Sequence, residues 1–125
     1  MAGKFRSAQA LSWPVKVKIA KGKNRFDTEE IEIKYKRLSF DELKNLATSL
    51  KLPEDATDQE RKDVDELYFS EVRDCIVDWK IDDETGKPLE FTPDNLDLVM
   101  DNVDYRNAIF REFWEFQNGG AVTKN

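Results

Sequence analysis

The sequence predicts an α+β domain that is mainly α, with an N-terminal β-hairpin followed by a bundle of about four helices. Near the N-terminus, apolar and charged residues alternate on both sides of a polar turn, as is typical of a hairpin. Further along, several segments carry apolar residues at a spacing of about 3.6, which is typical of amphipathic helices. The length of 125 residues suits one domain, which we expect over residues 13–117, between a flexible arm at 1–12 and a flexible tail at 118–125.

The predicted hairpin spans residues 14–36 and has one apolar face. Its turn lies in the segment KGKNRFD, where Gly22 and Asn24 tolerate the backbone angles that reverse a chain. A hairpin alone is marginally stable in water, so this face has to pack against other elements. The residues on the face are Val15, Val17, Ile19, Ile31, Ile33 and Tyr35.

Two helices are predicted next, at about 39–51 and 57–79. Each begins with the capping-box pattern S/T-x-x-E, at Ser39 and at Thr57, in which a hydroxyl and a carboxylate bond free amide groups of the first turn. Pro53 ends the first of these helices. The apolar stripe of the second helix consists of Val64, Leu67, Tyr68, Val72, Cys75, Ile76 and Trp79.

The last two helices are predicted at about 93–103 and 105–117. Thr92 and Pro93 are the residue types favoured at an N-cap and at the first helical position. Asp104 is expected to cap the final helix, and a pair of glycines follows its last residues. The two helices therefore complete the predicted bundle.

Composition and charge argue against several classes of function. A net charge of −6 disfavours nucleic-acid binding, and the one basic segment, residues 16–25, is best explained as a solvated face of the hairpin. The sequence has no run of about 18 apolar residues, so we expect no membrane-spanning segment. It also has no His, the commonest general base, and its lone cysteine, Cys75, falls on an apolar stripe. We therefore expect a protein that is not an enzyme and that holds no metal or cofactor.

The acidic stretch DWKIDDETGKPLEF allows a test for calcium binding. With Gly86 at the sixth position of an EF-hand loop, Ile81 would be the first ligand and Thr92 the twelfth. Ile81 has no side-chain oxygen and the twelfth position requires Glu, so the EF-hand pattern fails at both ends. We interpret the stretch as a helix-to-helix connector with a polar turn, in which Ile81 can pair with Leu89. Substitution of Asp83 by Ala is then expected to be nearly silent.

The final helix carries more aromatic residues than one core-facing stripe requires. A first face holds Tyr105, Ile109, Phe113 and Phe116. Phe110 and Trp114 lie about 100° around the helix axis from that face, so either the helix is deeply buried or its second face meets a partner. Trp13, just before the hairpin, presents the same alternatives. From this pattern we predict that Trp13, Phe110 and Trp114 bind a partner.

Two motifs carry a resemblance to a known family. The first is the junction that follows the hairpin, Lys36-Arg37-Leu38-Ser39-Phe40-Asp41-Glu42. The second is a tryptophan-to-leucine segment with Trp79, Ile81, Gly86, Pro88, Leu89, Phe91, Thr92, Asp94, Asn95 and Leu96. In this order and in a chain of this length, the motifs resemble those of the tail assembly chaperones of long-tailed (siphophage-type) bacteriophages. The resemblance covers roughly residues 13–117.

The resemblance implies a small protein of the host bacterial cytoplasm that binds the tape measure protein before the tail tube polymerises. It implies no catalytic residue and no cofactor. Many members of the family are also made in a frameshift-extended form that recruits tube subunits, so the tail tube protein is implied as a partner of such a form. Self-association would suit a protein that coats a long client. The family has no fixed client-binding motif, so the roles of Trp13, Phe110 and Trp114 come from the pattern alone.

Two other hypotheses stay open from the sequence. One is a structural component of the phage tail, such as a tail completion or connector subunit, that is retained in the virion. The other is a small enzyme that uses paired carboxylates and a hard cation. Both can be distinguished from a chaperone by experiment, the first by its presence in purified particles and the second by cation binding.

Overall fold

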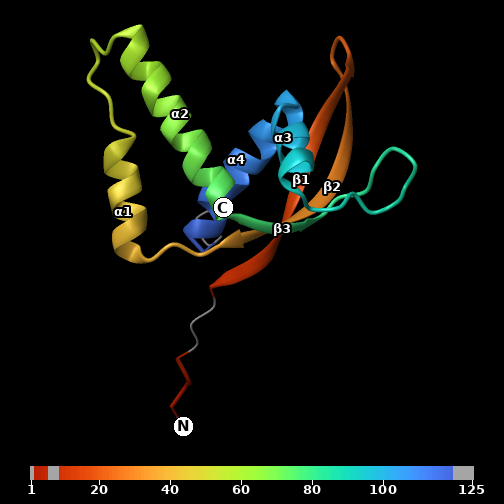
Figure 1. Cartoon of the computed structure of the whole chain (residues 1–125), viewed down its shortest axis with the longest axis horizontal. Coiled ribbons are helices and arrows are strands. Elements are labelled where there is room, and N and C mark those ends of the chain that lie inside the picture. The colour runs from red at the N-terminus through yellow and green to blue at the C-terminus, as the bar shows by residue number, and fades with distance from the viewer. Residues whose placement is uncertain (1, 6–8, 120–125) are drawn as a thin grey trace.

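The computed structural model describes residues 2–5 and 9–119. Its elements, in chain order, are β1 (Ala10–Gly22), β2 (Arg25–Lys36), α1 (Phe40–Ser49), α2 (Asp58–Cys75), β3 (Ile76–Lys80), α3 (Pro93–Met100) and α4 (Val103–Gln117). The strands form one antiparallel sheet in the order β1-β2-β3. Figure 1 shows α4 between the long hairpin on one side and α2 on the other. The prediction of an α+β domain that begins with a hairpin is confirmed. The prediction of a mainly α fold is not, because a third strand extends the hairpin to a three-stranded sheet and makes the fold mixed α+β.

The hairpin is longer than predicted at its N-terminal end. β1 begins at Ala10, which pairs with Lys36, so the last residues of the expected flexible arm belong to the sheet. The turn is at Lys23-Asn24, where Asn24 takes a positive φ of 60°, which Asn tolerates better than most residues. Residues 2–5 lie outside regular secondary structure, and positions 1, 6–8 and 120–125 of the predicted arm and tail lie outside the described residues.

The predicted helix at 57–79 is wrong beyond Cys75, because the chain continues as strand β3. Trp79 pairs with Ile33, and Ile76 pairs with Tyr35 across a bulge that leaves one extra residue in β3. Ile76 and Trp79 are three positions apart, and the bulge lets both of them be buried. A spacing of three between buried residues is also the spacing of a helical stripe, so the sequence pattern fitted a helix. The edge of β2 offers unpaired backbone groups that a strand satisfies and a helix cannot.

Three of the four helix starts follow the predicted capping. Ser39 and Thr57 both form complete capping boxes, and Thr92 caps α3 with proline in its first turn. The fourth start differs, because Asn102 caps α4 in place of Asp104. The Asn102 side chain accepts hydrogen bonds from two amides of the first turn, so α4 begins at Val103 and α3 stops at Met100, earlier than predicted.

The core lies between the apolar face of the sheet and the helices. The predicted hairpin face is there, with Val15, Val17, Ile31, Ile33 and Tyr35 buried and Ile19 half-buried. The Tyr35 hydroxyl donates to the carbonyl of Ile109 on α4 at 2.7 Å, which fastens α4 to the sheet. Burial raises the pKa of the Tyr35 phenol, and the Glu112 carboxylate raises it further, so the hydroxyl stays protonated as a donor.

Candidate functional site

Trp13 lies half-buried on β1, against one flank of α4. Its indole Nε1 donates to Glu112 Oε1 at 2.9 Å. Its ring meets the Phe116 ring edge-on, with the centroids 5.6 Å apart. Trp13 is therefore already engaged with the fold, and only part of its surface is accessible to a partner.

Phe110 and Trp114 lie on another flank of α4, where they meet α2. Tyr68 stacks on Trp114 with the ring centroids 5.9 Å apart, and it meets Phe110 edge-on at 4.8 Å. Phe69 also contacts Phe110, at 6.1 Å between centroids. We call the half-buried residues Tyr68, Phe69, Phe110 and Trp114 the aromatic seam. The second face of α4 thus meets a neighbouring helix of the same chain, and the outer part of the seam stays exposed.

The aromatic seam has one polar anchor. The Tyr68 hydroxyl donates to the carbonyl of Phe110 at 3.1 Å, so the ring is held across α4. Burial raises the pKa of this phenol to about 12. The guanidinium of Arg106 lies 4.3 Å from the Phe69 centroid and 5.0 Å from the Phe110 centroid, which adds cation–π contact at one end.

The predicted partner-binding residues do not form one surface. Trp13 contacts Glu112, two positions before Trp114, and two positions are about 200° of rotation around an α-helix axis. Trp13 and the Phe110–Trp114 pair therefore lie on different flanks of α4, and exposed Arg111 and Asn107 lie on the polar side of the helix. The sequence pattern found the second aromatic face of the helix but could not show that α2 covers part of it.

The second of the two motifs runs from the end of β3 through the connector into the first turn of α3. The Trp79 indole Nε1 donates to the carbonyl of Leu89 at 2.8 Å, and its ring meets Phe91 edge-on at 4.9 Å. The Leu89 amide donates to the carbonyl of Ile81 at 2.7 Å, so the predicted pairing of these residues is present. The Asn95 side chain donates from Nδ2 to the Glu90 carbonyl at 2.8 Å and holds the start of α3. These motif residues therefore stabilise the fold.

Asp83 organises the turn within this connector. Its Oδ1 accepts hydrogen bonds from Thr85 Oγ1 at 2.6 Å, from the Thr85 amide at 2.8 Å and from the Lys87 amide at 3.1 Å. The Thr85 hydroxyl bond, followed by the backbone bonds, lowers the pKa of the Asp83 carboxyl. The expectation that an Asp83→Ala substitution is nearly silent is therefore revised, because the change would remove every one of these bonds.

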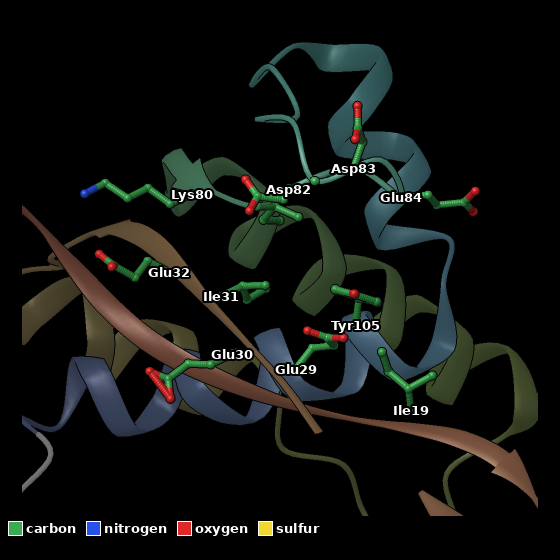
Figure 2. A pocket seen from close by; sticks show the side chains of 12 residues that line it. Ile19, Glu29, Glu30, Ile31, Glu32, Lys80, Asp82, Asp83, Glu84 and Tyr105 are labelled. Atoms are coloured by element: carbon green, nitrogen blue, oxygen red, sulfur yellow. The ribbon is translucent and has the colours of Figure 1, made fainter. Parts of the chain in front are cut away.

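An acidic hollow of about 780 Å³ lies between β2 and this connector. Figure 2 shows carboxylates of β2 on one side of it and carboxylates of the connector on the other. Its acidic residues are Glu29, Glu30, Glu32, Asp82, Asp83 and Glu84, and its apolar residues include Ile19, Ile31 and Ile81. The sequence does not predict this hollow, because nothing in the pattern of residues indicates that β2 and the connector face each other.

Cys75 is buried at the end of α2. Burial, with a smaller contribution from the Glu71 carboxylate, raises the pKa of its thiol to about 11, so it stays protonated and unreactive near neutral pH.

Among residues 2–5 and 9–119, no three Cys, Asp or Glu side chains are placed to hold a metal ion. Within the same ranges, no helix has the length and apolar character that a membrane crossing requires.

Comparison of the chain with protein-family models, with curated proteins and with solved structures finds no match.

Proposed function

We propose that the chain is a non-enzymatic phage tail assembly chaperone, made in the host bacterial cytoplasm, that binds the tape measure protein and keeps it soluble before the tail tube polymerises. The aromatic seam carries the proposal, because its rings are half-buried on a domain whose core is filled by other residues. Support also comes from the two motifs that resemble this family, of which the second builds the connector between β3 and α3.

The seam suits a helical client with an apolar stripe. Partly exposed aromatic rings supply large contact areas at a low cost in conformational entropy, and amphipathic helices commonly bind in grooves between helices. Two further apolar side chains on the helices, Leu67 of α2 and Phe40 of α1, are also exposed. The net charge of −6 would keep a complex with an apolar client in solution.

Co-expression with the tape measure protein encoded in the same genome tests the proposal. We expect the unaltered chain to raise the soluble fraction of the client, and Trp114→Ala to lower that fraction because it removes one of the half-buried rings of the seam. Phe26→Ala is the control, since Phe26 is 62% exposed on the hairpin, away from α2. The melting temperature of each variant shows that it still folds. A client that stays insoluble beside the unaltered chain contradicts the proposal.

The further partners follow from the same proposal. A frameshift-extended form would recruit the tail tube protein, and self-association would let several copies coat one client.

Mass spectrometry of purified particles tests the competing hypothesis of a tail completion or connector subunit. A chaperone is expected to be absent from the virion, so a stoichiometric amount of the chain in particles would favour the structural role.

A further inference from the structure

The edge of β2 is only partly covered by β3. The last residue pair between these strands joins Glu32 to Lys80, after which the connector turns away from the sheet. β2 itself continues to Arg25, paired with β1 on its other side. Among the described residues, no backbone hydrogen bond reaches the segment Asp27–Ile31 of β2 from the β3 side. The acidic hollow lies beside this open edge (Figure 2).

The strand register shows which backbone groups of β2 point to its open edge. Pro14 on β1 is paired with Glu32 on β2 and has no N–H, so the two residues cannot exchange two backbone hydrogen bonds. They therefore form a non-hydrogen-bonded pair, in which the backbone N–H and C=O of Glu32 point away from β1 and toward β3. Because bonding pairs alternate along an antiparallel ladder, Glu30 and Thr28 have the same orientation. The carbonyl of Lys16, opposite Glu30, confirms this, since it points outward and accepts from Arg111 Nη2 at 3.1 Å. Thr28 and Glu30 therefore direct their N–H and C=O groups to the open edge.

The outer edge of β1 is blocked at two positions, whereas Thr28 and Glu30 on β2 have no such block. On β1, Pro14 removes a donor and the Arg111 guanidinium covers the Lys16 carbonyl. On β2, the backbone groups of Glu30 face a hollow of about 780 Å³, and those of Thr28 point to the same edge just beyond the lining of the hollow. Native sheets commonly block an exposed edge, so an unblocked edge beside an open hollow is a place where an additional strand can pair.

The residues that line the hollow indicate which side chains an added strand would carry. A strand beside β2 points alternate side chains to opposite faces of the sheet. On the core face those side chains would meet Ile31, Ile19 and Tyr105, with the Glu29 carboxylate beside them. On the outer face they would lie across from Glu30 and diagonal to Glu32, where opposite charges are favourable. Lys80 is the only basic residue among the described residues that line the hollow, so the charge calls for a basic partner.

We propose that the open edge of β2 at Thr28 and Glu30 binds an extended segment of another protein, in which apolar residues alternate with Lys or Arg, as an added strand in line with β3. The site is separate from the aromatic seam, and the inference does not rest on the proposed chaperone function. It assigns a second binding surface, which pairs with the backbone of its partner and recognises positive charge.

Amide hydrogen exchange on the unaltered chain tests the pairing directly. The probe is a capped peptide of about six residues with alternating valine and lysine, a typical strand length. We expect the peptide to slow exchange at the amides of Thr28 and Glu30, which point to the open edge. The amides of Glu29 and Ile31 already face β1 and should be unchanged. Unchanged exchange at Thr28 and Glu30 at a saturating peptide concentration would overturn the proposal.

A matched pair of proline variants tests the same contact by affinity. Thr28→Pro removes an N–H that points to the open edge, and we expect it to weaken peptide binding about tenfold, the effect of losing one or two hydrogen bonds. Ser12→Pro makes the same change on the outer edge of β1, where it should leave binding unaltered. Both positions have N–H groups that no strand uses, so both variants should fold. Peptide binding by Thr28→Pro at the unaltered affinity contradicts the assignment.

Two further comparisons test the identity of the occupant. A peptide with glutamate in place of lysine should not slow exchange at Thr28 and Glu30, since it would add negative charge to the hollow. Equal binding of both peptides would overturn the requirement for a basic segment.

Sedimentation of the chain alone should show no association through this edge. Self-association that Thr28→Pro abolishes would make a second copy the occupant, and would contradict the assignment to another protein.

Discussion

At the scale of single residues, Trp79 shows how a motif residue serves the fold. Its side chain is 7% exposed, on a strand that has only five residues. It donates a hydrogen bond to the connector through Leu89 and packs edge-on against Phe91. One side chain therefore joins the sheet to the segment that leads into α3.

Substitution of Trp79 by Ala should lower the free energy of unfolding by about 3–5 kcal/mol, the usual cost of truncating a buried aromatic residue. The cause is a cavity between β3 and the connector, together with an unpaired Leu89 carbonyl. Urea denaturation followed by circular dichroism measures the change. Val77→Ala is the control on the same strand, because Val77 is 42% exposed, and it should cost much less. Equal losses in the two variants would show that Trp79 has no special role.

At the scale of elements, local sequence signals determined where helices begin. The capping boxes at Ser39 and Thr57 place α1 and α2 within one residue of their predicted starts. Backbone and side-chain hydrogen bonds from Ser39 lower the pKa of Glu42, and those from Thr57 lower the pKa of Glu60. Their ionised forms are therefore favoured in the folded protein.

The lowered pKa values of Glu42 and Glu60 predict that the stability of the folded protein depends on pH. Both carboxyls have a lowered pKa in the folded state, so their contribution to stability is complete above the unfolded value of 4.5 and is lost as the pH falls below it. A double variant, Glu42→Gln with Glu60→Gln, keeps the acceptor oxygens but cannot titrate. Its melting temperature should fall less than that of the unaltered chain between neutral pH and a pH below 4.5. Parallel melting curves for the two proteins would contradict this origin.

At the scale of the whole molecule, α4 holds together segments that are distant in sequence. Gln117, near its end, is 6% exposed. Its Oε1 accepts from the Leu38 amide at 2.9 Å, and its Nε2 donates to the Lys36 carbonyl at 2.8 Å. The last turn of α4 thereby fixes the passage from β2 to α1. A single polar residue at a helix end carries no sequence signal for such a role, so the sequence does not predict it.

Substitution of Gln117 by Ala should lower the free energy of unfolding by about 2 kcal/mol, because it leaves two backbone groups without partners in a largely buried place. Chemical denaturation measures the loss. Gln59→Ala is the matched control, since Gln59 is exposed and bonds only Asp63 within its own helix. A loss at position 117 no greater than that at position 59 would mean that the β2–α1 passage is held by other contacts.

The elements whose signals are local follow from the sequence alone. Alternation placed the hairpin and its buried face, and capping residues placed three of the four helix starts, because these patterns act within a few residues. The second aromatic face of α4 was also visible, as a surplus of rings around Phe110 and Trp114.

Which surfaces these elements contact depends on the tertiary structure. The chain after Cys75 becomes a strand because β2 offers it an unpaired edge, and the surplus rings of α4 are half-buried because α2 crosses them. The open edge at Thr28 and Glu30 depends on where β3 stops. Each of these outcomes is a contact between segments far apart in the chain, and a local pattern of residues contains no information about which distant surface will satisfy it.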